Sequence, residues 1–202
     1  ENEGARGTNA PRQLSGHGLA YWTDGKEERI LYVTPGYRLI ALNALTVTPV
    51  PSFGKNGVVD LKEDDDQDIN LVEGDIGLHS TPVVARNVVI VGAAHLNGGV
   101  PKSKKNVKGY VRGFDARTGK RLWIFHTIPQ PGEFGYDTWS KDAYKLSGGA
   151  NAWAGVTVDA KLGMVFASTG SASFAFYGVT RPGANLFADC VLALDARTGT
   201  RV

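Results

Sequence analysis

One short pattern recurs three times in this chain and constrains its fold more than any other feature. In the middle copy, two apolar runs flank the polar residues 115–120, with Asp115 at the start of the turn. The other two copies start at Asn43 and Asp195, so the anchors lie 72 and 80 residues apart. Gly119 can adopt the positive φ that a tight hairpin requires, and Asp115 can accept hydrogen bonds from the turn backbone. The pattern therefore predicts strand, turn and strand, repeated along an all-β chain.

Similar short apolar runs separated by turn residues predict further strands. They lie at residues 19–22, 29–33, 39–42, 81–84, 87–92, 111–114, 122–125, 153–158, 164–168 and 191–194. The spacing between anchors exceeds the ~40–50 residues of a typical propeller blade, so each unit must carry a long excursion. Residues 1–15 are polar and predict no regular structure, and no segment has the periodicity of an amphipathic helix.

Composition excludes several classes of function. The 202 residues carry a formal net charge of only +2, which argues against a nucleic-acid partner. A single cysteine, Cys190, precludes an internal disulfide. No apolar run approaches the ~18 residues of a membrane span.

The sequence offers no self-evident catalytic or metal motif. Residues 62–68 (KEDDDQD) form an acidic segment in which Asp64, Asp66 and Asp68, with Asp75, have EF-hand offsets. Ile69 stands where that loop needs glycine, so a solvated loop at residues 62–68 is the preferred interpretation. The glycines before Lys120 lack the spacing of a phosphate-binding loop. The four histidines are too far apart to suggest zinc.

Several longer segments carry a specific resemblance. Residues 17–22 (HGLAYW), 111–139 (VRGFDARTGKRLWIFHTIPQPGEFGYDTW), 151–170 (NAWAGVTVDAKLGMVFASTG) and 181–187 (RPGANLF) closely resemble the pyrroloquinoline-quinone (PQQ)-dependent dehydrogenases, particularly their membrane-associated glucose dehydrogenase branch. The resemblance implies part of an eight-bladed β-propeller across residues 16–202. It implies about three consecutive blades of four antiparallel strands, at residues 19–60, 79–127 and 151–202.

The resemblance also implies residues that contact the quinone. Trp153 matches the tryptophan on which the quinone lies, although by itself it would be interpreted as a core residue. His17 stands where the family commonly has an arginine that pairs with a quinone carboxylate, and a solvent-facing histidine is the alternative. His79 and Asn151 match positions that offer polar contacts to the quinone, with structural roles as the alternative.

A calcium or magnesium ion that shares its ligands with the quinone is implied in the same way. Asn97 matches a ligand position. Ser171 stands where alcohol-oxidising members have asparagine, and Ser173 where a sugar-oxidising member has threonine. The vicinal-cysteine ring of the alcohol dehydrogenases is absent, because Pro11 and Arg12 occupy its place.

The implied activity is oxidation of a sugar or alcohol by hydride transfer to the metal-bound quinone, with ubiquinone or a cytochrome as electron acceptor in the periplasm, in some members at the membrane. The aspartate that serves as catalytic base, in the motif HDxWD, is expected beyond Val202. The chain alone should therefore be inactive and should need the rest of the propeller. A non-enzymatic propeller scaffold that binds other proteins is the alternative.

Overall fold

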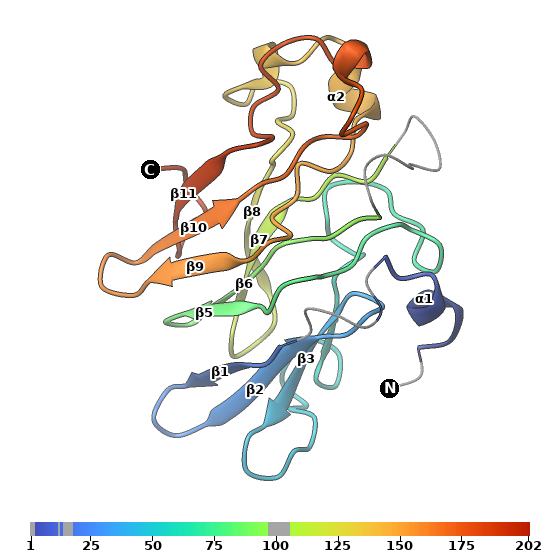
Figure 1. The fold of residues 1–202 in the computed structure, drawn as a ribbon. Helices are drawn as coiled ribbons and strands as arrows, with labels where there is room; N and C mark the ends of the chain where they lie inside the picture. Colours follow the sequence, from blue (N-terminus) through green and yellow to red (C-terminus); the bar gives the residue numbers. More distant parts are fainter. Residues whose placement is uncertain (1–2, 12, 14–17, 97–105) are drawn as a thin grey trace.

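Three antiparallel β-sheets, consecutive in sequence, form the body of the chain (Figure 1). This computed structural model describes residues 3–11, 13, 18–96 and 106–202. The first sheet contains β1 (Ala20–Thr23), β2 (Glu28–Val33), β3 (Arg38–Asn43) and β4 (Val58–Asp60). The second contains β5 (Val83–Ala85), β6 (Val88–Val91), β7 (Val111–Asp115) and β8 (Arg121–Phe125). The third contains β9 (Val156–Asp159), β10 (Met164–Ser168) and β11 (Val191–Asp195).

Each sheet is a simple meander in which neighbours in sequence are neighbours in space. The first strands of the sheets also contact one another, β1 with β5 and β5 with β9. The buried side chains form one apolar cluster between the first and second sheets and another between the second and third. The predicted all-β architecture is confirmed, with sheets that stack side by side like propeller blades.

The repeated turn has the predicted structure. The Asp115 carboxylate accepts hydrogen bonds from the backbone N–H groups of Arg117 and Thr118 at 2.9 and 2.7 Å, and Gly119 has a φ of 73°. Asp195 and Gly199 repeat this arrangement, with a φ of 70° at the glycine. The side chain thus satisfies turn donors that β-pairing cannot reach.

Alanine substitutions at two turn glycines should separate backbone strain from steric overlap. Both Gly119 and Gly163 have positive φ, but a Cβ atom at Gly119 would lie 2.6 Å from Val59 Cγ2, whereas the space around Gly163 is open. We expect Gly163→Ala to cost about 1–2 kcal/mol of stability through the left-handed backbone alone. Gly119→Ala should lower the free energy of unfolding by clearly more, because steric overlap adds to the backbone strain. Equal urea midpoints for the two variants would contradict this prediction.

The third sheet departs from the prediction of four-stranded blades, because it has three strands. A single bridge between Leu194 and Arg201 lies where a fourth strand would begin. The division of the chain into domains stays a prediction.

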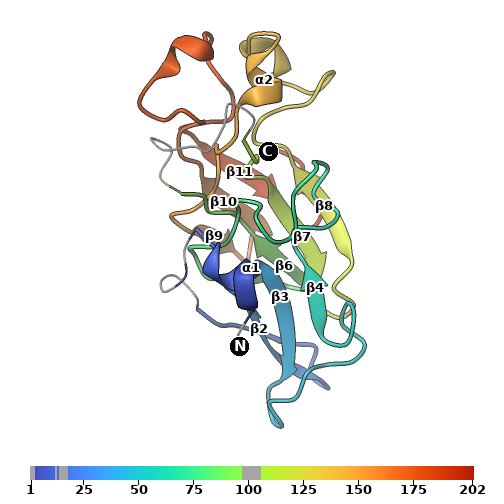
Figure 2. The same cartoon turned by 90° about the vertical axis from the view of Figure 1, so that its right-hand side faces the viewer.

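The prediction of no regular structure in residues 1–15 is wrong for Gly4–Thr8, which form the short helix α1 beside the first sheet (Figures 1 and 2). Arg6 is buried there, and its guanidinium binds the Asp60 carboxylate at 2.5 and 2.6 Å. Glu3 accepts hydrogen bonds from the Gly36 N–H and from Arg38. Partners more than 30 residues away in sequence hold this polar segment, so local composition could not reveal it.

The interpretation of residues 62–68 as a solvated loop is wrong for two of its charged residues. Asp65 is buried, and its Oδ1 lies 2.9 Å from Arg112 Nε on β7. Lys62 is buried and donates a hydrogen bond to the Gly74 carbonyl. Lys62 and Asp65 anchor the loop at the junction between the first two sheets, while residues 63, 64, 66 and 68 are exposed as expected.

The long excursion after β8 is well packed. It contains the 3-10 helix η1 (Tyr136–Thr138) and the short helix α2 (Ala143–Leu146), and it has a small apolar cluster of its own around Ile128 and Trp139. It lies beside the loop after β10, which contains η2 (Gly178–Thr180), in both views (Figures 1 and 2). Among the described residues, no helix has the length and apolar character needed to cross a membrane.

Candidate functional site

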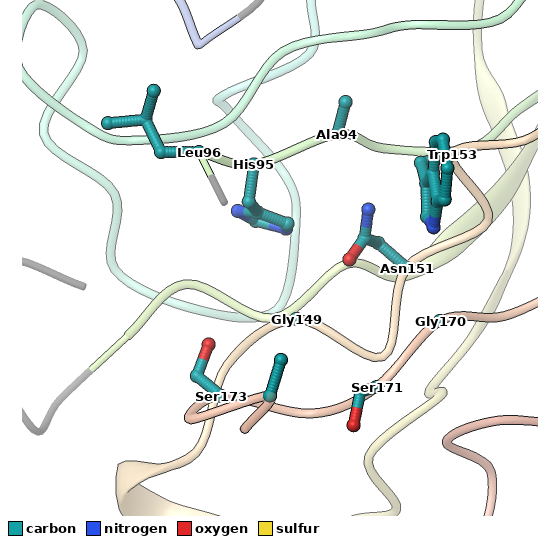
Figure 3. A pocket seen from close by; sticks show the side chains of 10 residues that line it. Ala94, His95, Leu96, Gly149, Asn151, Trp153, Gly170, Ser171 and Ser173 are labelled. Carbon is teal, nitrogen blue, oxygen red and sulfur yellow. The ribbon is translucent and has the colours of Figure 1, made fainter. Parts of the chain in front are cut away.

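A pocket of about 380 Å³ lies at one end of the second and third sheets. Its walls are residues 94–96 after β6, residues 149–153 before β9 and residues 170–175 after β10 (Figure 3). Because the strands are antiparallel, the end of β6, the start of β9 and the end of β10 all meet at this side of the sheets. The volume falls in the range typical of small-molecule and cofactor sites.

Trp153 presents its indole to this pocket. The side chain is 44% exposed, which is unusual for the largest apolar residue type. A Cβ atom at Gly170 would lie 2.8 Å from the indole Nε1, so glycine at position 170 gives the ring room to lie against the backbone. The His79 ring lies 5.9 Å from the indole, tilted by 46°. The arrangement offers a flat aromatic surface to a ligand.

Asn151 is held in a fixed orientation beside the indole. Its Nδ2 donates a hydrogen bond to the Ala93 carbonyl at 3.0 Å, and its backbone carbonyl accepts one from the Gly170 N–H. A Cβ atom at Gly109 would lie 2.1 Å from Asn151 Cβ, so the two backbones can approach this closely only because residue 109 is glycine. With Nδ2 engaged, Oδ1 is the group that can accept a hydrogen bond from a ligand.

Ser171 and Ser173 line the opposite wall with their hydroxyls turned in different directions (Figure 3). Ser171 Oγ accepts a hydrogen bond from Arg181 Nη2 at 3.2 Å. Arg181 also binds Asn185 Oδ1 at 2.8 Å, which fixes the guanidinium behind Ser171. A fixed positive charge at this distance makes Ser171 Oγ a poor ligand for a cation.

His95 also lines the pocket, and no signal in the sequence distinguished it from the other histidines. Its Nδ1 lies 2.7 Å from the Asp75 carbonyl, an oxygen that can only accept, so Nδ1 carries the proton. Burial lowers the pKa of His95, which keeps the ring neutral. Its Nε2 is buried with no hydrogen-bond partner among the described residues. An unpaired buried acceptor of this kind costs about 1–3 kcal/mol, which a ligand donor could offset.

The structure brings four of the predicted site residues together around one pocket: Asn151, Trp153, Ser171 and Ser173. His79 joins them through its ring contact with Trp153. His17 and Asn97 lie outside the described residues.

The residues present fit a flat, polar-edged ring system better than they fit a metal ion. The exposed indole, the Asn151 amide and the unpaired His95 nitrogen suit the ring. Within the described part of the chain, no three His, Cys, Asp or Glu side chains gather where they could hold a metal. The side chains that line this pocket supply only neutral oxygen and nitrogen donors to such an ion.

Comparisons with known proteins agree with this geometry. The family described as "PQQ: Glucose/ethanol/alcohol dehydrogenase, beta-propeller domain" matches residues 2–202. The glycerol dehydrogenase large subunit of Gluconobacter oxydans (strain 621H) is 31% identical over 191 residues, which cover 91% of this chain and 24% of that protein. Quinoprotein glucose dehydrogenase A of Acinetobacter calcoaceticus is 31% identical over 171 residues, covering 82% of this chain and 20% of that protein.

A solved structure of a quinoprotein dehydrogenase has the same fold. The quinohemoprotein alcohol dehydrogenase of Comamonas testosteroni superimposes with a TM-score of 0.71 at 25% identity, over 98% of this chain and 28% of that chain. The chain therefore spans about a quarter or less of the length of these relatives. Since the family match covers nearly every residue, the chain belongs to the β-propeller domain family of the PQQ-dependent glucose, ethanol and alcohol dehydrogenases.

Proposed function

We propose that this chain forms the part of a PQQ-dependent dehydrogenase that carries the floor of the quinone site, in a protein that oxidises a sugar or an alcohol. The observation that carries the proposal is the half-exposed Trp153 indole inside a pocket of about 380 Å³. When bound, the quinone accepts the hydride that leaves the carbinol carbon of the substrate.

The residues of this chain would bind and orient the quinone. The face of Trp153 would stack against the ring system, an interaction worth about 0.5–1.5 kcal/mol beyond area burial. Asn151 Oδ1 and His95 Nε2 can accept hydrogen bonds from ligand donors, because the Asn151 oxygen can only accept and the proton of His95 is on Nδ1. His79 would limit lateral movement through its contact with Trp153. His17, if it contacts a quinone carboxylate, would do so with a charge that depends on pH.

The metal part of the proposal rests on hard-ligand chemistry. Calcium or magnesium would use the oxygens of Asn97 and Ser173, while Ser171 is less suitable because its oxygen accepts a hydrogen bond from Arg181.

The remaining functions would come from the parts of such a dehydrogenase that this chain does not span. The base that removes the substrate hydroxyl proton would be among them. We therefore propose that the chain acts with the rest of the propeller, in the periplasm or at its membrane face, and passes electrons to ubiquinone or a cytochrome.

The proposal is tested by titrating the full-length protein with PQQ, with and without calcium or magnesium, and following bound-quinone absorbance together with tryptophan fluorescence. Trp153→Ala should weaken quinone binding about tenfold, the equivalent of ~1.4 kcal/mol. Tyr21→Ala is the matched control, because Tyr21 is 50% exposed and does not line the pocket. Dye-linked oxidation of glucose and simple alcohols then identifies the substrate.

Two outcomes would overturn the proposal. Saturable binding that is unchanged in Trp153→Ala would place the quinone elsewhere. Absence of binding at any metal concentration would favour the alternative of a non-enzymatic scaffold.

A further inference from the structure

The registers of the three sheets make equivalent positions identifiable without any assumption about function. On the second strand of each sheet, one residue pairs with the turn anchor: Arg29 with Asn43, Val88 with Asp115, and Met164 with Asp195. The same three residues pair on their other side with Trp22, Ala85 and Asp159 of the preceding strand. Trp22 and Arg29 of the first sheet therefore correspond to Ala85 and Val88 of the second.

At the junction of the first and second sheets, these positions are filled by two large side chains. Trp22 is 1% exposed, and its Nε1 donates to Asn87 Oδ1 at 3.2 Å. Arg29 donates hydrogen bonds to the carbonyls of Ala116 and Arg117. The Arg117 guanidinium lies 5.0 Å above the Trp22 ring. The junction is thus closed by an indole held beneath an arginine.

At the junction of the second and third sheets, the equivalent side chains are too small to fill the space. A pocket of about 360 Å³ opens there, lined by Ala85 and Val88 on one side and by Leu162, Ala196 and Arg197 on the other. Arg197 occupies the position of Arg117, since each is the second residue after its turn anchor. The pocket therefore lies where the Trp22 side chain lies in the first junction, and Arg197 lines it as Arg117 lies over Trp22.

This pocket is separate from the one at Trp153. It lies at the β5–β6 and β9–β10 turns, which project to the left in Figure 1, whereas Trp153 precedes β9 at the other end of the strands. Its ligand is therefore independent of the proposed quinone.

The charges around the pocket favour an anion. Arg86 and Arg197 both line it and are exposed, and neither forms an ion pair within the described part of the chain. The single acidic residue in the lining, Asp195, is occupied by its own turn, where hydrogen bonds from Thr198 and Arg197 lower its pKa. Two cations against one carboxylate leave a net positive rim above an apolar floor.

We propose that this inter-sheet pocket binds a planar aromatic carboxylate of about the size of an indole. The ring replaces the side chain that Trp22 supplies at the first junction, and it lies between Ala85 and Arg197. The carboxylate faces the guanidinium groups of Arg86 and Arg197, which provide charge-assisted hydrogen bonds and cation–π contact.

The test is isothermal titration calorimetry of the full-length protein with indole-3-acetate as the probe, and with neutral indole and acetate as comparison ligands. We expect one site for indole-3-acetate with a dissociation constant below ~1 mM. Ala85→Trp, which restores the side chain of the first junction, should abolish binding. Arg197→Gln should weaken indole-3-acetate at least about threefold, because it removes both a partly solvated ion pair and the cation–π contact, and should weaken indole less, because neutral indole loses only the cation–π contact.

The repeat provides matched controls. Arg117→Gln removes the equivalent arginine at the filled junction and should leave binding unchanged, as should Trp153→Ala, which separates this site from the quinone pocket. If Ala85→Trp fails to fold, the contrast between Arg197→Gln and Arg117→Gln still decides the question. Binding that persists in folded Ala85→Trp, equal affinity for acetate and indole-3-acetate, or no saturable heat up to ~5 mM, well above the expected constant, would overturn the proposal.

Discussion

Replacement of Arg112 by leucine is expected to destabilise the protein by about 3–5 kcal/mol, because it breaks a buried ion pair and leaves one partner behind. Arg112 is fully buried on β7, where its Nε lies 2.9 Å from Asp65 Oδ1. Its Nη2 donates to the Leu61 carbonyl at 2.7 Å and to the Tyr37 hydroxyl at 3.2 Å. One guanidinium from the second sheet thus binds three groups of the first sheet and its following loop.

Urea unfolding measures this loss, and Arg117→Leu is the control. Arg117 pairs with Asp24 at the surface, so its replacement should cost about 1 kcal/mol or less. Equal losses for the two variants would show that burial of the Arg112 pair has no special energetic weight.

The deficit of Arg112→Leu should also grow with pH. Burial raises the pKa of Asp65 to about 6, although Arg112 opposes this shift. The folded-state pKa of Asp65 lies above its unfolded value of 3.8, so the folded protein holds this proton more tightly than the unfolded chain does. The stability that protonated Asp65 contributes is therefore fully present below pH 3.8 and is lost as the pH rises through about 6. Without Arg112 the pKa rises further, so the difference between variant and wild type should widen above pH 6. A constant difference from pH 5 to pH 8 would contradict this prediction.

Replacement of Trp123 by alanine is expected to cost a further large amount, about 3–5 kcal/mol, because it removes a buried aromatic side chain from the junction of the second and third sheets. Trp123 is 7% exposed on β8, and its Nε1 donates to the Ala196 carbonyl at 3.1 Å. Cβ atoms at Gly113 and Gly199 would lie 2.2 and 2.5 Å from the indole. The ring is therefore enclosed between one glycine of its own sheet and one of the next.

The neighbouring residue provides the control for Trp123. Leu122 lies on the same strand with its side chain 46% exposed, so Leu122→Ala should change the urea midpoint little. A small effect of Trp123→Ala would show that the third sheet is held to the second by other contacts.

The local features of the fold were predictable because they depend on short-range chemistry. Asp115 and Gly119 specify their turn through hydrogen bonds and backbone conformation within five residues, and the same holds at Asp195 and Gly199. Short apolar runs likewise predicted ten of the eleven strands to within a few residues, and missed β4 (Val58–Asp60). The helix α1 was missed because Arg6 and Glu3 find their partners in the first sheet, far away in sequence.

The candidate site was predictable only in part. The resemblance selected Trp153, Asn151, Ser171 and Ser173, and the fold brings them to one pocket. His95 could not be selected, because its role depends on the Asp75 carbonyl, which fixes its tautomer from 20 residues away. The suitability of Ser171 as a metal ligand depends in the same way on Arg181, whose position relative to Ser171 is set by folding of the loop between them.

By itself, the sequence determined the all-β class, the repeat and its turns, and membership in the family of PQQ-dependent dehydrogenases, because these depend on local patterns and on a family match that runs along nearly the whole chain. Only the tertiary structure decided which charges are buried, as with Arg112 and Asp65, and which junction between sheets is filled. In the amino-acid sequence, Trp22 and Ala85 are both ordinary strand residues, and nothing shows that their positions are equivalent. The register makes them equivalent, and the difference in their volumes leaves a closed junction in one place and a pocket in the other.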